Sequence, residues 1–530
     1  MKRTKFQKRI IAFVLAFVFL IGGSTASVAA DGVVNDSVTD VTIESMRDLL
    51  DVVSYDEYCN KYYEKDTEGK VITDNGKPDG KPVWTVDRAE EDIVIDGTAY
   101  DADNTNAAVS VGTYGGQTGL YLPETGEVSW KVNVPKDGRY TIVVEYYAVE
   151  AKNSPVGRIL KINGEIPFSE ARYLTMSKAY ANAYGEESKY TFSNKNGDYV
   201  RYFNVDIFGN EIRTTSGQSP QWRTYTFKDA DGFSTSPFEV VFHEGENIIT
   251  FDAESEPVVI KSITLCAPQE RQSYADYLEL HKDKATGTGN VKIEAEMPTS
   301  TSSQTIYAIE DRSSPANSPI STKQQLLNTI GGDKWQIAGQ WIRYELTVDK
   351  SGMYEIAARF KQNINDGMYS SRILNIYSVG LNEGDSGYYN GIPFEEAAQI
   401  SFGYSDEWQS GVVGYYDDNH KHHGLSFYFE EGVTYYLEFE VTLGDMGEVV
   451  SRVQASLAAI NQCYLDIIKL TGTSPDNYRD YGFYRIMPET MIQMVIQSRE
   501  LNRVAALLEE ITGEKGSNSS TLVKVASLLD

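Results

Sequence analysis

The sequence has few cysteines, a shortage of basic residues and a single long hydrophobic run. Its 3 cysteines, Cys59, Cys266 and Cys463, are too few and too scattered for the disulfide framework of a small secreted domain. At most one bridge can form. Cys266 follows an apolar strand-like stretch and Cys463 lies in a helical pattern, so we expect both to be buried thiols and not nucleophiles.

Signatures of common enzymes are also missing. No Gly-x-Ser-x-Gly, His-Glu-x-x-His or phosphate-binding loop occurs in the chain. Composition alone leaves a glycosidase carboxylate pair open. The duplicated glutamates Glu170 and Glu396, however, lie in turn-like repeats, as structural residues do. We therefore expect a non-catalytic protein.

The one long hydrophobic run lies at the N-terminus. Five basic residues within positions 2–9 precede the apolar residues 10–22, and small residues follow at 28–30. This pattern predicts a secretory signal peptide over residues 1–30 and export to the extracellular space or the cell envelope. No cysteine follows the run, so we expect no lipobox and no lipid anchor. No later stretch approaches the length of a membrane span.

Acidic residues dominate the charge. The chain has 48 Lys+Arg against 76 Asp+Glu, a net charge of −28, and removal of the five basic residues of the signal peptide brings it to about −33. Such a surface repels nucleic acid and anionic lipid and suits a neutral ligand or a cation.

The chain carries the same module twice. Five short segments recur in the same order, which indicates an internal duplication. They are residues 54–58 with 273–277, 136–140 with 350–354, 158–160 with 372–374, 166–171 with 392–397, and 242–245 with 429–432. Duplicated non-catalytic modules commonly raise avidity for a repetitive ligand.

The hydrophobic period divides the chain. A helical spacing over 41–63 gives way to a period of two from about 84 to 266, which returns in the second copy, and a helical period resumes after 447. We predict a mainly β protein with two tandem antiparallel β-sandwich (jelly-roll) domains, helical linkers and an α-helical C-terminal segment. The predicted boundaries are 1–30 for the signal peptide, 31–83 for a helical N-terminal segment and linker, 84–268 for the first sandwich, 269–288 for a helical linker, 289–446 for the second sandwich and 447–530 for the helical segment.

Five segments resemble parts of the β-jelly-roll carbohydrate-binding modules of families 6 and 35. They are the Glu-Ala-Glu of residues 294–296, the strand and Gly-x-Tyr turn of 341–354, and in the first copy the segments 128–140, 244–250 and 259–265. The resemblance implies a structural calcium ion at Glu294 and Glu296, since alternate strand residues point the same way and carboxylates suit a hard cation. The first copy lacks Glu-Ala-Glu.

Sugar recognition needs flat aromatic faces beside polar groups. Loop aromatics in long polar segments are the candidates, whereas Trp130 and Trp341 head repeated strands and are expected in the cores. The candidate carbohydrate-binding residues are Trp222, Trp408, Tyr404, Tyr415 and Tyr416. The histidine-rich segment 417–423 lacks a defined zinc spacing, and we interpret it as a polar hairpin loop.

A second resemblance concerns the whole order of segments. A signal peptide, twin sandwiches with Ser-Tyr-x-x-Tyr linkers and segment 470–481 resemble the front half of large clostridial extracellular proteins, in which a sugar-transporter solute-binding domain follows. This resemblance implies an ABC-transporter permease as partner, reached through a C-terminal domain beyond residue 530.

The sequence favours one functional hypothesis over two others. We expect non-catalytic binding of extracellular polysaccharide or oligosaccharide, in the service of sugar uptake, with one binding module beside one structural spacer. The alternatives are a structural or protein-interaction module of the cell envelope and a glycoside hydrolase or lyase.

Overall fold

The computed structural model describes residues 52–76, 80–184, 190–194, 197–201, 203–364, 366, 368–417, 419–476 and 478–529. The predicted signal peptide and residues 41–51 of the first predicted helix lie outside these ranges. Residues 53–530 form one compact unit. Within the described part, no helix has the length and apolarity needed to cross a membrane.

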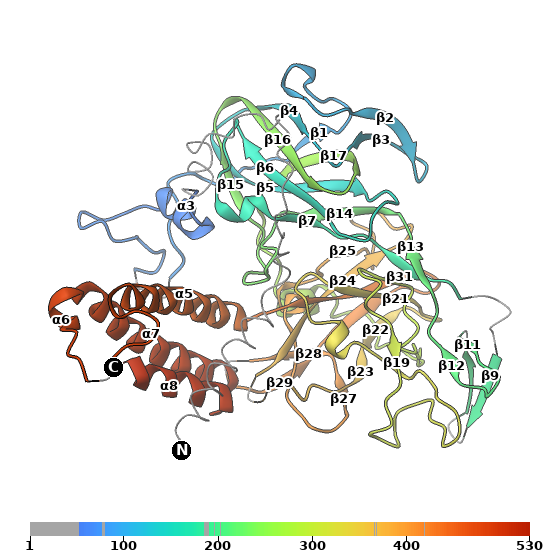
Figure 1. The fold of residues 1–530 in the computed structure, drawn as a ribbon. Helices are drawn as coiled ribbons and strands as arrows, with labels where there is room; N and C mark the ends of the chain where they lie inside the picture. Colours follow the sequence, from blue (N-terminus) through green and yellow to red (C-terminus); the bar gives the residue numbers. More distant parts are fainter. Residues whose placement is uncertain are drawn as a thin grey trace, which may run out of the picture. The chain divides into compact units, whose positions relative to one another are not determined.

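The predicted fold class is confirmed: the chain is mainly antiparallel β with a helical C-terminal segment (Figure 1). In the first copy, seven strands form a sheet in the order β14-β5-β17-β3-β2, with β1 on β17 and β15 on β5, and four form a second sheet, β4-β16-β6-β7. The strands are β1 (Ile93–Asp96), β2 (Ser110–Tyr114), β3 (Gln117–Leu122), β4 (Glu127–Val134), β5 (Gly138–Tyr147), β6 (Val156–Ile162), β7 (Leu174–Met176), β14 (Trp222–Thr226), β15 (Glu239–Phe242), β16 (Gly245–Ser255) and β17 (Val258–Cys266).

Alternating apolar residues of the two sheets form the first core. Trp130 of β4 and Ile260 of β17 are both 0% exposed, and Phe251 packs edge-on against Trp130. The indole nitrogen of Trp130 donates to the carbonyl of Gly97, so the buried ring leaves no polar atom unpaired. The period of two seen in the sequence is therefore the spacing of inward-facing residues.

The second copy contributes six strands to an eight-stranded sheet of order β13-β8-β18-β21-β31-β24-β25, with β26 on β24. Its other ladders are β22-β30, β23-β27, β28-β29 and β19-β20. The strands are β18 (Ser300–Thr301), β19 (Ala308–Ile309), β20 (Thr329–Ile330), β21 (Trp341–Thr347), β22 (Gly352–Glu355), β23 (Ala357–Phe360), β24 (Ser370–Ser378), β25 (Asn390–Gly391), β26 (Ile400–Phe402), β27 (Gln409–Val412), β28 (Gly414–Tyr416), β29 (His422–Gly424), β30 (Ser426–Phe429) and β31 (Thr434–Thr442).

The remaining two strands of that sheet come from the first copy. Residues 177–221, which we call the arm, contain β8 (Tyr180–Asn182), β9 (Tyr190–Asn194), β10 (Gly197–Arg201), β11 (Asn204–Val205), β12 (Glu211–Ile212) and β13 (Ser216–Gln218). Strand β13 pairs with β8, and Tyr180 of β8 pairs with Thr301 of β18. The two copies therefore share one sheet.

The repeated Ser-Tyr-x-x-Tyr and Ile-Pro-Phe-x-Glu-Ala motifs meet in each copy. The former opens the short helices α3 (Tyr55–Lys61) and α4 (Tyr274–Leu280), capped by Ser54 and Ser273. The backbone nitrogens of Tyr55 and Tyr274 donate to the carboxylates of Glu170 and Glu396, at 2.9 and 2.7 Å. Both duplicated glutamates thus bind a helix N-terminus, which is a structural role.

The C-terminal segment consists of α5 (Met446–Thr471), α6 (Phe483–Ile486), α7 (Pro488–Thr512) and α8 (Ser517–Leu529). Helices α5 and α7 end at Gly472 and Gly513, whose φ angles of 73° and 72° favour glycine. A small core of Met446, Val449, Val504 and Leu508 joins α5 to α7. The three cysteines of the chain are free thiols, and Cys59 and Cys463 are buried.

Candidate functional site

Two of the predicted sugar-binding residues occupy the same position in the two copies. Strand β14 pairs with β5 so that Thr226 lies opposite Val143, and β27 pairs with β23 so that Val412 lies opposite Ala357. Val143 and Ala357 each follow the repeated Gly-x-Tyr turn by the same number of residues. Trp222, the first residue of β14, and Trp408, the residue before β27, therefore lie at the same register of equivalent strands. The arm lengthens the first copy just before this point, which hides the match in the sequence.

In the first copy, Trp222 belongs to an aromatic cluster with Tyr147 and Tyr114. The ring centroids of Trp222 and Tyr147 are 5.4 Å apart and those of Tyr147 and Tyr114 are 6.1 Å apart. The indole nitrogen of Trp222 donates to the carbonyl of Tyr114 at 2.8 Å, which fixes the ring. All three side chains are half-buried. Tyr114 and Tyr147 were not among the predicted residues.

This aromatic cluster lies on the outer face of the seven-stranded sheet. Along β5, Val144 and Tyr146 are buried at 0% and 1% exposure, and the alternate residues Glu145 and Tyr147 face the other way. Glu145 forms a partly exposed ion pair with Lys261 at 2.8 Å. The cluster thus offers apolar ring surface to solvent beside two charged groups. The alternation of Tyr147 with buried neighbours was the sequence signal that could have revealed it.

Gly115 allows the β2–β3 turn to approach these rings. Its φ of +51° favours glycine, and a β-carbon there would lie 2.9 Å from Cε2 of Tyr147 and 3.1 Å from Nε1 of Trp222. Any larger residue would push the turn away from the cluster.

The equivalent position in the second copy has a different chemistry. The indole nitrogen of Trp408 donates to Oγ of Ser313 at 3.2 Å, and the guanidinium carbon of Arg359 lies 6.0 Å from the ring centroid. Arg359 donates to Asn317, Ser314 and Ser410 at 3.0 to 3.1 Å. Trp408 is thus surrounded by hydrogen-bonding groups, whereas Trp222 is surrounded by rings.

The three predicted tyrosines make other contacts. Tyr404 is 36% exposed and its hydroxyl donates to Asp406 at 3.0 Å. Tyr415 stacks on His423 and packs against the second core. Tyr416 stacks on Tyr369 with ring centroids 4.7 Å apart. The rings of Tyr415 and Tyr416 pack within the protein and that of Tyr404 is exposed, and a sugar-binding role for all three stays a prediction.

Segment 417–423 is the polar hairpin that the sequence suggested. It links β28 to β29, and Nε2 of His423 lies 2.9 Å from the carboxylate of Asp417. Among the described residues, no group of three or more His, Cys, Asp or Glu side chains could hold a metal ion.

The carboxylates predicted to bind calcium have basic partners. Glu294 accepts from Lys292 at 2.6 Å, and Glu296, only 2% exposed, forms an ion pair with the guanidinium of Arg201. Burial raises the pKa of Glu296 to about 7, against the opposing attraction of Arg201. Calcium requires six to eight oxygen ligands, and a guanidinium at the carboxylate does not fit that set. Residues 294–296, the Glu-Ala-Glu that the resemblance places on a strand, have no strand geometry.

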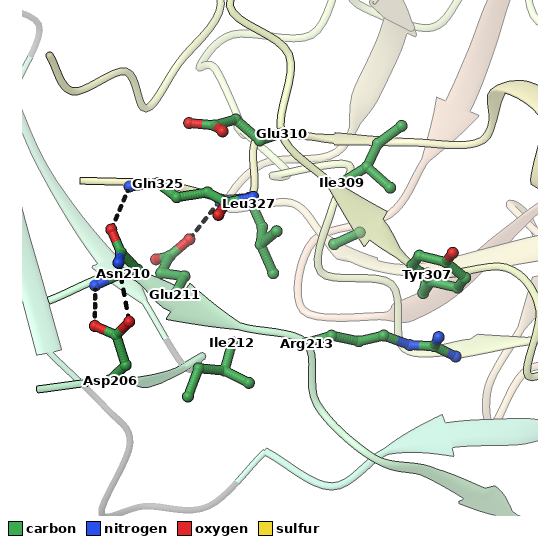
Figure 2. Close-up of a pocket in the computed structure, with 11 residues that line it drawn as sticks. Asp206, Asn210, Glu211, Ile212, Arg213, Tyr307, Ile309, Glu310, Gln325 and Leu327 are labelled. Carbon is green, nitrogen blue, oxygen red and sulfur yellow. Dashed lines mark hydrogen bonds between the residues drawn. The ribbon is translucent and has the colours of Figure 1, made fainter. Parts of the chain in front are cut away.

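A groove of about 580 Å³ lies between the arm and the second copy (Figure 2). Ile212 and Arg213 of the arm line one side, and Tyr307, Ile309 and Glu310 the other. The Arg213 guanidinium stacks on the Tyr307 ring with its carbon 3.6 Å from the centroid. The polar groups at the other end of the groove, including Asp206 and Asn210, bind one another. This groove could not be predicted from the sequence, because its two sides lie far apart in the chain.

Comparison with known proteins adds a likeness for the helical segment. The family model described as "Bacterial solute-binding protein, 4-helix bundle domain" matches residues 448–529, which lie within α5 to α8. No curated protein matches the sequence.

Solved structures similar to the chain include family 35 carbohydrate-binding modules. A module from Clostridium thermocellum is 16% identical over 34% of this chain and 97% of its own, with a TM-score of 0.16. The CBM35 from Cellvibrio japonicus Abf62 is 14% identical over 34% of this chain and 94% of its own, with a TM-score of 0.18. A Podospora anserina GH26-CBM35 beta-(1,4)-mannanase is 10% identical over 34% of this chain, and the chain covers 29% of that enzyme, with a TM-score of 0.19. Likenesses of this size assign no function. The family-model match is limited to residues 448–529, the helical segment.

Proposed function

We propose that the protein binds carbohydrate without catalysis, with the cluster of Trp222, Tyr147 and Tyr114 as its principal contact. The observation that supports this is the tryptophan at the same register of both sandwiches, half-buried and held by a hydrogen bond from its indole nitrogen. A fixed, half-exposed ring binds the C–H face of a sugar at little entropic cost. A neutral ligand also suits the strongly negative chain.

The experiment compares single and double tryptophan variants. A glycan array first identifies the best ligand, and isothermal titration calorimetry then measures its affinity. Trp222→Ala is expected to weaken that affinity at least tenfold, and the double variant with Trp408→Ala is expected to weaken it further. Tyr484→Ala, which removes an aromatic side chain 82% exposed on α6, is the matched control and should bind normally. Unchanged affinity in the double variant would contradict the proposal.

The proposal extends to sugar uptake and to location. Residues 448–529 resemble a domain of bacterial solute-binding proteins, and residues 1–30 have the pattern of an exported chain. We infer an extracellular or envelope-bound receptor component that presents a polysaccharide or oligosaccharide to an ABC-transporter permease. Deletion of the gene should slow uptake of the labelled glycan that the purified protein binds. In a separate assay, release of reducing sugar from that glycan by the purified protein would instead indicate a hydrolase.

One observation favours a second candidate, a protein-interaction module of the cell envelope. At the tip of the β11–β12 hairpin, Ile207 and Phe208 are 93% and 75% exposed, and Val205 behind them is 48% exposed. Exposed apolar side chains gathered at one site often mark a protein contact. Capture of one envelope protein that is lost with Ile207→Asp and retained with Trp222→Ala would support this candidate.

A further inference from the structure

The carboxylate expected to bind calcium in the second copy is held by an arginine of the first. Arg201, at the end of β10 in the arm, is 0% exposed. Its Nε and Nη2 donate to the two oxygens of Glu211 at 2.9 and 2.8 Å, and its Nη1 donates to Glu296. Nη2 also donates to the carbonyl of Leu327. The guanidinium therefore joins two carboxylates and one backbone carbonyl in a closed site.

The surroundings of Arg201 complete this arrangement. The second oxygen of Glu211 accepts from the backbone nitrogen of Leu327 at 2.7 Å, as Figure 2 shows. The ring of Phe203 lies under the guanidinium at 5.1 Å, within a small apolar cluster that also contains Ala308. Buried carboxylates need a cation or hydrogen-bond donors, and here one planar side chain supplies both. Of the two carboxylates predicted to bind calcium, Glu296 is therefore paired with Arg201, and Glu294 is paired with Lys292.

We propose that Arg201 replaces a structural metal ion in the second copy. The first copy lacks the Glu-Ala-Glu motif, and through its arm it provides the cation for the Glu296 of that motif in its neighbour. The carboxylate thus fastens the arm to the second sandwich, and the protein is stable without calcium. This role is independent of the proposed carbohydrate binding.

The first test is a calcium titration of the whole protein. The thermal midpoint of the wild type in EGTA and in millimolar calcium should agree within about 1 °C, because Glu296 is already paired with Arg201 and Glu294 with Lys292. A calcium-dependent rise of several degrees that disappears in Glu296→Gln would overturn the proposal.

The second test removes the guanidinium. Arg201→Ala leaves Glu211 and Glu296 facing each other, so its thermal midpoint in EGTA should fall and should recover in part with millimolar calcium. Arg223→Ala is the matched control: it removes another buried arginine between the copies, but its partner Glu438 retains Arg343, so calcium should not restore its midpoint. If the thermal midpoint of Arg201→Ala is the same with and without calcium, the proposal that the guanidinium takes the place of a metal ion is contradicted.

A third variant keeps the test decisive if Arg201→Ala does not fold. Arg201→Lys keeps the positive charge and loses the paired donors to Glu211, so it should fold with a lowered thermal midpoint and show no calcium response. A rise of several degrees in the thermal midpoint of Arg201→Lys on addition of millimolar calcium would overturn the proposal.

Discussion

At the scale of single residues, tryptophan serves two separate purposes in this chain. Trp130 and Trp341 are 0% and 1% exposed, which confirms their predicted core positions, and Trp222 and Trp408 are half-buried at the sheet surface. The two kinds could be told apart from the sequence, since the core residues head repeated strands of alternating pattern. The equivalence of Trp222 with Trp408 could not, because it depends on strand pairing across an insertion.

Replacing a core tryptophan should therefore mainly lower stability, whereas replacing a surface tryptophan should mainly lower ligand affinity. Trp130→Ala is expected to lower the free energy of unfolding by about 3–5 kcal/mol through a buried cavity. Trp222→Ala should lower it by only about 1 kcal/mol, the value of a typical hydrogen bond, while it removes ligand affinity. Urea unfolding followed by circular dichroism measures the first effect and calorimetric titration the second. A loss of stability in Trp222→Ala as large as in Trp130→Ala would mean that this ring is structural.

Glu438 provides a prediction about pH. Burial by itself raises its pKa, but Arg223 and Arg343 outweigh burial and hold the pKa below its usual value. A lowered pKa in the folded state gives stability that is complete above the unfolded pKa of about 4.3 and is lost as the pH falls below it. The thermal midpoint should drop between pH 5 and pH 3. In Glu438→Gln the midpoint at pH 7 should be lower, and the part of the acid-induced drop that comes from this residue should disappear.

At the scale of elements, the helices α3 and α4 show what the repeated motifs do. The hydroxyl of Tyr58 accepts from the backbone nitrogen of Val241 at 2.9 Å, and that of Tyr277 accepts from Tyr428 at 2.8 Å. In the second copy the nitrogen of Tyr428 also donates to Tyr389 at 3.1 Å. In the first copy the motif tyrosine is the side-chain acceptor for this backbone nitrogen. In the second copy the motif tyrosine shares that role with the hydroxyl of Tyr389.

This difference predicts unequal effects for two matched substitutions. Tyr58→Phe leaves the buried nitrogen of Val241 without that acceptor and should cost about 1–3 kcal/mol of unfolding free energy. Tyr277→Phe should cost less, because the Tyr389 hydroxyl still accepts from Tyr428. Chemical denaturation of both variants under the same conditions makes the comparison, and a larger loss for Tyr277→Phe would contradict it.

Local sequence signals predicted most elements well. The Asn163-Gly164 pair is typical of a tight turn and forms one, with φ angles of 53° and 87°, and the long helices α5 and α7 end at glycines, as helices commonly do. Residues 294–296 do not form the strand that the resemblance implies, and Glu296 is paired instead with Arg201, 95 residues away in the chain. A partner so distant in the chain leaves no trace in the period of the segment itself.

At the scale of the whole molecule, the copies are joined by more than a linker. Besides the shared sheet, Arg223 of the first copy forms an ion pair with Glu438 of the second at 3.0 Å and stacks on Trp341 at 4.0 Å. The indole nitrogen of Trp341 in turn donates to Ser177 of the arm at 2.9 Å. Domain boundaries drawn from the sequence separate two sandwiches, and the structure adds a segment of the first to the sheet of the second.

We therefore expect the two sandwiches to unfold together. Differential scanning calorimetry of the whole protein should give one transition for both, with calorimetric and van't Hoff enthalpies that agree. Arg223→Ala should weaken the coupling and broaden or split that transition. Two well-separated β-sheet transitions in the wild type would show that the contacts between the copies contribute little.

The arm also limits how this protein can be taken apart and reused. Independent domains can be cut at their linkers and fused to other proteins. A fragment of the second sandwich cut at residue 269 would lack β8 and β13, and the edge of β18 would be exposed. Exposed strand edges pair with one another, so this fragment is expected to aggregate. A transplant of this sandwich would have to include the arm.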